Sequence, residues 1–244
     1  MTTSSYYAPG PFNFRSRADF AADRLKMAIL RGELQPGERV IPSALCELWG
    51  ISQTPMREAF QRLVASGLVE LEDHKGAKVA SISAADCEDL IGLRSMLEGR
   101  ALRESLAAAD DTWRESAELW YERLSETLTD DILEDAGKLA AFNHAHQNFH
   151  LAMLGGCSSH WLVHTIKLLM DNSLRYRMRR VQPRGGAASL LAEHEALLQA
   201  ALQNRSEDLV RLNHDHLWRT VTLVRELSSD DTSSSIHSVA ANET

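Results

Sequence analysis

The N-terminal third of the chain has apolar residues at helical spacing in three short segments, followed by two apolar runs of strand length. The helical segments cover residues 18–31, 43–49 and 52–66. The two runs, residues 68–72 and 77–80, are joined through His74-Lys75-Gly76. Three helices and a hairpin in this order are typical of a winged helix-turn-helix.

The third of these helices has the features of a DNA recognition helix. Ser52 is a suitable N-cap, and Pro55 falls in the first turn, where a missing N–H costs little. Its inward-facing apolar stripe consists of Met56, Ala59, Phe60, Leu63 and Val64. Its exposed N-terminal end carries Gln53, Thr54, Arg57 and Gln61. Such side chains suit a helix that enters the major groove, although an ordinary amphipathic surface helix has a similar pattern.

After residue 85 the pattern stays helical. The predicted helices lie near residues 85–109, 111–128, 131–154, 159–181, 187–203 and 206–227. Short breaks between them predict an antiparallel bundle of about six helices. The predicted fold class is therefore mostly α, with an N-terminal winged helix-turn-helix followed by this bundle.

The same pattern predicts the domain boundaries. We expect a flexible arm at residues 1–14, a DNA-binding domain at 15–81, a linker at 82–85, an α-helical domain at 86–227 and a disordered tail at 228–244. The tail is rich in Ser, Asp and Thr, a composition that cannot bury much apolar surface.

The net charge of −8 is unevenly divided along the chain. Residues 1–81 carry 10 Lys and Arg against 9 Asp and Glu, so the acidic excess belongs to the remainder. DNA binding by the first part therefore depends on where individual cations lie. Candidates for phosphate contacts are Arg24, Arg31, Arg39, Arg57, Arg62, Lys75 and Lys78. For some of them the alternative is solvated surface charge.

Composition also bears on location. No run of about 18 apolar residues is present, which predicts no transmembrane helix and no membrane partner. Residues 1–14 lack the apolar core of a signal peptide. Three scattered cysteines, Cys46, Cys87 and Cys157, form no C-x-x-C pair. We therefore expect reduced thiols in a cytoplasmic protein.

Three segments of the first part carry a specific resemblance. They are GELQPG at residues 32–37, ISQTPMREA at 51–59 and SGLV at 66–69. Residues 24–80 thereby resemble the DNA-binding domain of the GntR superfamily of bacterial transcription regulators.

This resemblance implies a homodimer that binds a palindromic double-stranded DNA operator. The expected DNA-contacting residues are Arg39, Ser52, Gln53, Thr54, Arg57, Arg62, Lys75 and Gly76. Gln53 departs from the family, which usually has Arg at this position. Because Arg prefers guanine and Gln prefers adenine, the operator is expected to differ there.

The second part resembles the FCD effector-binding domain of the FadR-type branch of the superfamily. The matching segments are DLIGLRSMLE at residues 89–98, NFHLAML at 148–154, LLAEHEALL at 190–198 and HL at 216–217. Six bundle helices, rather than seven, favour the shorter VanR-like subgroup.

Four histidines of this part fall on predicted inward faces. His146 and His150 are four residues apart and project from one side of a helix. His194 and His216 continue the apolar stripes of two later helices. Each histidine alone is better explained as a hydrogen-bonded core residue, but several inward-facing imidazoles favour a shared metal site.

The resemblance refines this prediction. Many members of the branch bind a metal with one Asp and three His, and His150, His194 and His216 fall on the three histidine positions. His146 stands where the Asp is expected, four residues before His150, with Asn143 as the alternative ligand. Nitrogen ligands favour a divalent transition metal, with Zn²⁺ first and Ni²⁺ or Cu²⁺ as alternatives, over Mg²⁺ or Ca²⁺.

A small organic acid is the expected effector, because open coordination positions on a bound metal can accept a carboxylate. Arg94 resembles a family position that faces the pocket and can pair with that carboxylate. Pairing between Arg94 and Glu98, one turn on, is an equal alternative. Arg175 is a second candidate for effector binding, although its run of arginines is also typical of a solvated face.

Three classes of function remain. The predicted function is a DNA-binding transcriptional regulator, a repressor modulated by the acid at a metal site. One alternative is a regulator for which the metal itself is the signal. The other is a metalloenzyme, but the sequence has no H-E-x-x-H motif and no nucleophile elbow. We therefore expect no enzymatic activity.

Overall fold

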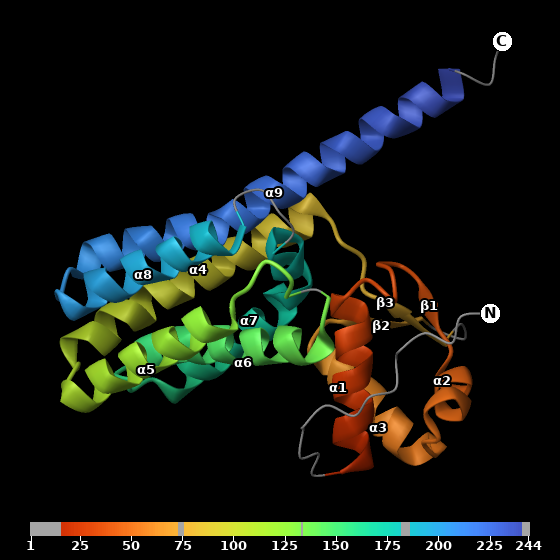
Figure 1. The fold of residues 1–244 in the computed structure, drawn as a ribbon, viewed down its shortest axis with the longest axis horizontal. Coiled ribbons are helices and arrows are strands. Elements are labelled where there is room, and N and C mark those ends of the chain that lie inside the picture. The colour runs from red at the N-terminus through yellow and green to blue at the C-terminus, as the bar shows by residue number, and fades with distance from the viewer. Residues whose placement is uncertain (1–15, 73–75, 133, 182–185, 241–244) are drawn as a thin grey trace. The chain divides into compact units, whose positions relative to one another are not determined.

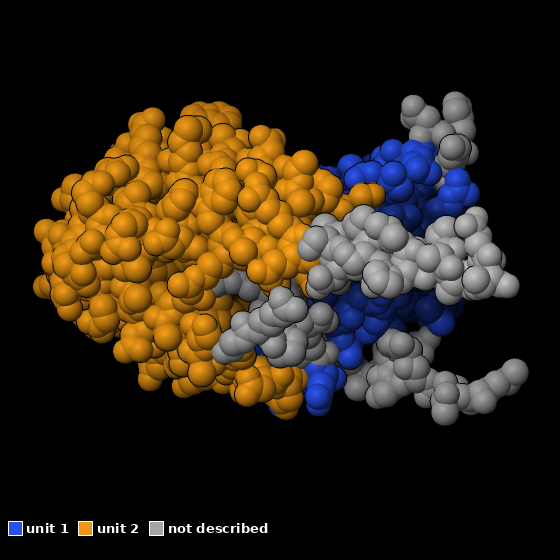
Figure 2. Space-filling view, turned by 90° about the horizontal axis from the view of Figure 1, so that it is seen from above, with its two compact units in different colours: residues 1–80, 132–140 blue, residues 81–131, 141–244 orange. Residues whose placement is uncertain are grey.

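The computed structural model describes residues 16–72, 76–132, 134–181 and 186–240, with side chains omitted at 136, 177–181 and 228–240. The chain divides into two compact units, shown in Figure 2. Unit 1 comprises residues 1–80 and 132–140, and unit 2 comprises residues 81–131 and 141–244. The predicted flexible arm, residues 1–14, lies outside the described residues.

Unit 1 contains the winged helix-turn-helix (Figure 1). Its elements are α1 (Arg17–Leu30), β1 (Arg39–Val40), α2 (Pro42–Trp49), α3 (Gln53–Ala65), β2 (Val69–Glu72) and β3 (Gly76–Val79). The strands form an antiparallel sheet in the order β1-β3-β2. Val69 pairs with Val79 and Glu72 with Gly76, so β2 and β3 form the wing hairpin.

The predicted apolar stripe builds the core of this unit. Met56, Ala59 and Leu63 of α3 are buried against Leu25 of α1. Between α2 and α3 the chain turns at Gly50, whose φ of 61° is left-handed and favours glycine. This turn sets the direction in which α3 leaves the core.

Two details of unit 1 differ from the sequence prediction. Strand β1 was not predicted, because two residues are too short to show an alternating pattern. Ser52 does occupy the N-cap position of α3, but its hydroxyl makes no capping hydrogen bond. This hydroxyl is exposed at the start of the recognition helix.

Unit 2 is an α-helical bundle, as predicted (Figure 1). Its helices are α4 (Ala84–Ala107), α5 (Asp111–Thr127), α7 (His160–Val181), α8 (Gly186–Leu202), α9 (Ser206–Ala240) and, from residue 141 on, α6 (Ala136–Met153). Helix α4 packs against both α7 and α9, and α8 packs against α5 and α9. An apolar cluster that includes Ile91, Tyr176 and Val221 joins α4, α7 and α9.

Some predicted boundaries are corrected by the structure. Helix α4 begins inside the expected linker 82–85, because the Ser83 hydroxyl caps it by accepting from the Asp86 N–H at 3.0 Å. Helix α9 continues through most of the expected disordered tail to Ala240. No Gly or Pro lies between residues 206 and 240 to interrupt its backbone hydrogen bonds. None of the described helices is long and apolar enough to cross a membrane.

Candidate metal centre and DNA-binding surface

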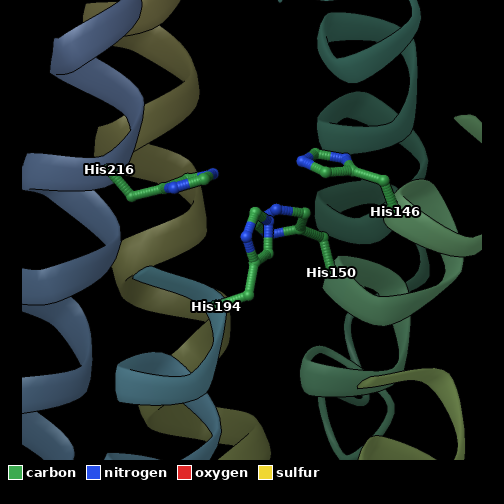
Figure 3. Close-up of side chains that lie close together, drawn as sticks. All are labelled: His146, His150, His194 and His216. Atoms are coloured by element: carbon green, nitrogen blue, oxygen red, sulfur yellow. The ribbon is translucent and has the colours of Figure 1, made fainter. Parts of the chain in front are cut away.

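The four predicted histidines converge inside unit 2 (Figure 3). His146 and His150 come from α6, His194 from α8 and His216 from α9. All four are buried, and each offers a ring nitrogen that lies within 4.8 Å of the ligand atoms of the others. Three helices that are separate in the sequence thus place their imidazoles around one point.

Hydrogen bonds at Nδ1 orient two of the rings. Nδ1 of His194 lies 2.7 Å from the carbonyl oxygen of Leu190, and Nδ1 of His216 lies 2.8 Å from Oε2 of Glu193. A carbonyl or carboxylate oxygen only accepts, so both rings donate from Nδ1. Nε2 of each ring is then the nitrogen that can bind a metal.

The donor set fits a divalent transition metal. Zn–N bonds are about 2.0–2.1 Å long, so nitrogens around one tetrahedral ion lie about 3.4 Å apart. The ligand atoms, which lie within 4.8 Å of one another, would have to move inward by about 1 Å or less each to reach this. Phe149 packs edge-on against His150 and His194 and surrounds the site with apolar surface. Imidazole nitrogens suit Zn²⁺, Ni²⁺ or Cu²⁺ better than Mg²⁺ or Ca²⁺.

A buried polar network lies on neighbouring helices. Arg94 of α4 donates from Nε to Glu98 at 2.6 Å and from Nη1 to Ser173 of α7 at 2.9 Å. Glu98 also accepts from Asn213 of α9 at 2.9 Å. Asn213 precedes His216 by three residues, so the network reaches the helix face that carries this histidine.

The Arg94–Glu98 ion pair, which the sequence suggested as an alternative, is present in the structure. The Nη2 nitrogen of Arg94 can bind a further partner, because it is buried and has no hydrogen bond with the described residues. A buried guanidinium nitrogen without a hydrogen bond is costly, and a polar ligand or water removes that cost.

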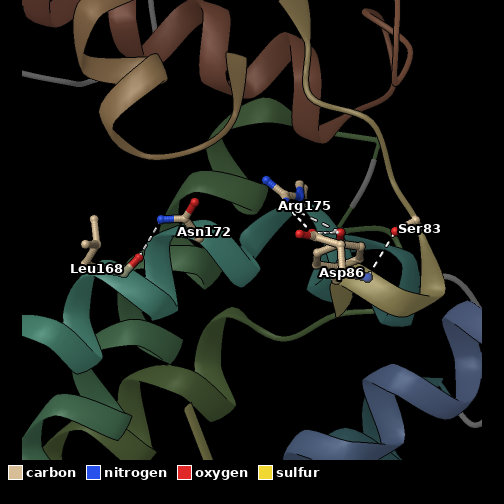
Figure 4. Close-up of polar contacts among 6 residues, drawn as sticks. Ser83, Asp86, Leu168, Asn172 and Arg175 are labelled. Carbon is tan, nitrogen blue, oxygen red and sulfur yellow. Dashed lines mark hydrogen bonds and ion pairs between the residues drawn. The ribbon is translucent and has the colours of Figure 1, made fainter. Parts of the chain in front are cut away.

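Arg175, the second candidate for effector binding, lies on α7 and points toward Asp86 in the first turn of α4 (Figure 4). Its Nη2 is 2.5 Å from Oδ2 of Asp86, which also accepts from the Tyr176 hydroxyl. Burial would raise the pKa of Asp86, but these two hydrogen bonds outweigh it and lower that pKa. Burial, and then the Asp86 contact, raise the pKa of Tyr176 to about 12. Arg175 therefore ties α7 to the first turn of α4.

Four further described histidines lie apart from the cluster. His144 packs edge-on against Trp120, and His214 contacts Ser95 and Trp218. His160 and His164 are exposed and stack on each other on α7. Sequence reasoning missed Glu193 and Asn213. The spacing of one turn before His216 could have indicated Asn213, whereas Glu193 contacts a histidine of another helix, which no local spacing reveals.

On the DNA side, the N-terminal end of α3 is exposed as predicted. Ser52, Gln53, Thr54 and Arg57 all face solvent. Arg57 forms no ion pair with the described residues, so its guanidinium is available for a ligand. The N-terminal end of α3 therefore carries short polar side chains and one arginine that is available for a ligand.

Three other candidate cations that the structure describes are engaged within unit 1. Arg62 pairs with Asp19 of α1, and this hydrogen bond lowers the pKa of Asp19. Arg39 lies 3.8 Å from Glu72, and Lys78 pairs with Glu70 and Glu72 at 3.2 and 3.3 Å. Gly76 begins β3 at the wing, whereas Lys75 lies outside the described residues.

A winged helix-turn-helix with an exposed polar recognition helix, followed by a bundle with a buried polar interior, defines a DNA-binding regulator. Residues 17–79 match the bacterial regulatory proteins of the gntR family, and residues 89–219 match the FCD domain. The chain belongs to the GntR family of transcription regulators, in the FadR-type branch that carries this domain. The family binds DNA operators and consists of regulators, which excludes the metalloenzyme alternative.

Similar proteins span almost the whole chain. The HTH-type transcriptional regulator BphR of Paraburkholderia xenovorans is 31% identical over 215 residues, covering 88% of this chain and 87% of that protein. The HTH-type transcriptional repressor GlaR of Escherichia coli is 29% identical over 206 residues, covering 83% and 93%. The solved structure of E. coli McbR/YncC has a TM-score of 0.67 at 18% identity, covering 88% of this chain and all of that chain, and it supports the fold alone.

Proposed function

We propose that this protein is a cytoplasmic repressor that binds a palindromic operator as a homodimer and is modulated by a small organic acid. The acid would bind inside the helical unit, together with a divalent metal. The observation that carries this proposal is the convergence of four buried imidazoles from three helices. The name of the similar repressor GlaR supports the direction of regulation.

At the operator, α3 enters the major groove and the wing contacts the backbone. Arg57 is the main side chain for base or phosphate contact, because it is exposed and makes no ion pair with the described residues. Gln53, Thr54 and Ser52 stand beside it at the helix start. Lys75 and Gly76 at the wing, with Arg39, remain candidates for backbone contacts. Arg62 contributes by holding α3 against α1 through Asp19.

The metal would be held by His146, His150, His194 and His216. When bound, it supplies a Lewis acid that can accept an anionic ligand. The four imidazoles leave its charge unneutralised, which favours an acid over a neutral effector. Zn²⁺ is the preferred ion, with Ni²⁺ as the alternative.

Arg94 would complete the effector site. Its Nη2 is buried and makes no hydrogen bond with the described residues, so it can donate to a carboxylate. Glu98 and Ser173 fix the remainder of the guanidinium. Arg175 is a weaker candidate, because Asp86 already binds its guanidinium. Instead, the Arg175–Asp86 pair can pass a change in α7 to the start of α4, which directly follows the DNA-binding unit in sequence.

A ligand screen tests the effector proposal. We expect a small carboxylic acid to raise the melting temperature of the Zn²⁺-loaded protein, because a ligand bound only by the folded state stabilises it. The measurement is a thermal-shift screen of mono- and dicarboxylic acids, run in parallel with metal-loaded and chelator-treated protein. Acids that stabilise both samples equally would show that the metal takes no part in effector binding.

The metal-sensor alternative has one observation in its favour. If all four histidines bound Zn²⁺, they would satisfy its tetrahedral preference and leave no position open for an acid. If the metal itself is the signal, chelation alone, at fixed acid concentration, should alter the operator affinity. If affinity responds to acid only while the metal stays bound, the acid is the signal.

We assign dimer formation to the exposed faces of α4 and α7. These helices are antiparallel neighbours, since Asp86 meets Arg175 at one end and Ser105 meets Gly156 at the other. Their exposed faces carry four large apolar side chains, Leu93, Met96, Trp161 and Leu168. A second copy of the chain is the expected occupant, because a two-fold operator requires two recognition helices.

The dimer proposal predicts that Met96→Glu with Leu168→Glu yields monomers at micromolar concentration. Each change places a charge at an apolar contact, where burial without a partner is costly. Leu119→Glu is the control, since Leu119 is about as exposed as Leu168 but lies on α5. Sedimentation velocity should give dimers for the wild type and the control. A wild-type monomer, or a double variant that stays dimeric, would contradict this surface.

A further inference from the structure

Glu193 adjoins His194 in the sequence but contacts a histidine of another helix. Its Oε2 lies 2.8 Å from Nδ1 of His216 on α9, and its side chain is 11% exposed. Its Oε1 forms an ion pair with Nη1 of Arg219, which lies three residues after His216. Helix α9 thus engages both oxygens of this α8 carboxylate.

This contact decides which nitrogen of His216 can bind a metal. Because an ionised carboxylate only accepts hydrogen bonds, the His216 ring carries its proton on Nδ1. Its Nε2 keeps the lone pair. His194 is oriented in the same way, but by the neutral carbonyl of Leu190. The two histidines therefore share a tautomer and differ in the charge of the acceptor behind them.

The difference in charge has a chemical consequence. A carboxylate behind a ligating imidazole raises the basicity of the ring and partly balances the charge of the metal. The four histidines supply no negative charge of their own when they bind. Glu193 brings a carboxylate into contact with one of them without occupying a coordination position.

We propose that Glu193, held by Arg219, is a positioning residue that orients His216 and strengthens its Nε2 as a metal ligand. This inference rests on the proposed metal site. It goes beyond that site by assigning part of the metal affinity to a residue that does not touch the metal.

The test measures Zn²⁺ affinity in the full-length protein by competition with a chromophoric chelator. Glu193→Gln is expected to weaken Zn²⁺ binding 10- to 100-fold, the usual effect of losing such a partner, while stoichiometry stays unchanged. The matched control is Glu195→Gln, the same charge change at an exposed position of α8, which should leave the affinity unchanged. Arg219→Gln should weaken binding less than Glu193→Gln, because Glu193 itself remains.

A second measurement reports the tautomer directly. Long-range ¹⁵N–¹H correlation spectra of the metal-free protein should show His216 protonated at Nδ1. In Glu193→Gln, the amide can either accept from Nδ1 or donate to it, so we expect a mixture of tautomers. A role for Glu193 in packing alone would not change this signature.

The outcomes separate this inference from the function on which it rests. Equal Zn²⁺ affinity and an unchanged tautomer in Glu193→Gln would overturn the role of Glu193 and leave the metal site intact. A wild-type protein that binds no Zn²⁺ would overturn the site and this inference together. If Glu193→Gln does not fold, Arg219→Gln decides the question, because Arg219 is 55% exposed and its replacement is expected to leave the fold intact. An unchanged Zn²⁺ affinity in Arg219→Gln would then overturn the proposal.

Discussion

Replacing His194 by Ala is expected to remove the metal and, with it, the part of the thermal stability that depends on the metal. A metal at 100 times its dissociation constant stabilises the folded state by about 2.7 kcal/mol. For a domain of this size that corresponds to roughly 5–10 °C, at about 2–4 °C per kcal/mol. Wild-type protein should therefore melt about 5–10 °C lower after chelation. The same treatment should not affect His194→Ala.

The response to chelator distinguishes this effect from ordinary packing. His194 is fully buried, so its truncation also leaves a cavity that lowers stability whether or not a metal binds. His150→Ala should behave like His194→Ala in metal content and in the loss of response. His164→Ala, an exposed histidine on α7, should retain one metal per protomer and the full response. Equal, substoichiometric metal in all four proteins would show that the cluster consists of hydrogen-bonded core histidines.

Much of the fold could be predicted because the residues at which its helices begin and end are indicated by the local sequence. The break at Asp110-Asp111 gave the start of α5 directly, and the glycines at 155–156 separated α6 from α7. Helix α4 starts within one residue of its predicted start, whereas the start of α6 was misplaced because Asp135 was not considered as a cap. Asp135 accepts from the Lys138 N–H at 2.9 Å and begins α6 five residues after the predicted start. For the last helix, composition predicted disorder where the backbone remains helical.

The histidine cluster was predictable only in part. Helical periodicity places His146 and His150 on one inward face, and His194 and His216 on the apolar stripes of two later helices. The family resemblance then matched three of these histidines to one metal site. Their convergence depends on how α6, α8 and α9 pack, which no local pattern contains. Glu193 was missed for the same reason, since its partner lies 23 residues away on another helix. The Arg94–Glu98 pair was predicted as an alternative because four-residue spacing is local.

Arg57→Ala is expected to weaken operator binding more than any other single change on the DNA face. A bidentate arginine contact to a base contributes about 1–3 kcal/mol, and a two-fold dimer makes it twice, so the predicted loss is about 30- to 20,000-fold. The operator is first obtained by selecting wild-type binding sites from a random DNA pool. Fluorescence anisotropy on the selected sequence then gives the affinity of each variant across a range of salt concentrations.

Arg62→Ala is the matched control, because it removes the same charge from the same helix. Arg62 pairs with Asp19, so this change should mainly lower the stability of unit 1 and reduce operator affinity less. The salt series then separates two roles for Arg57. Loss of a phosphate contact flattens the salt dependence, whereas loss of a base contact relaxes sequence preference at one symmetric position. If Arg57→Ala and Arg62→Ala weaken operator binding equally, the prediction that the Arg57 guanidinium makes the main contact between α3 and DNA is wrong.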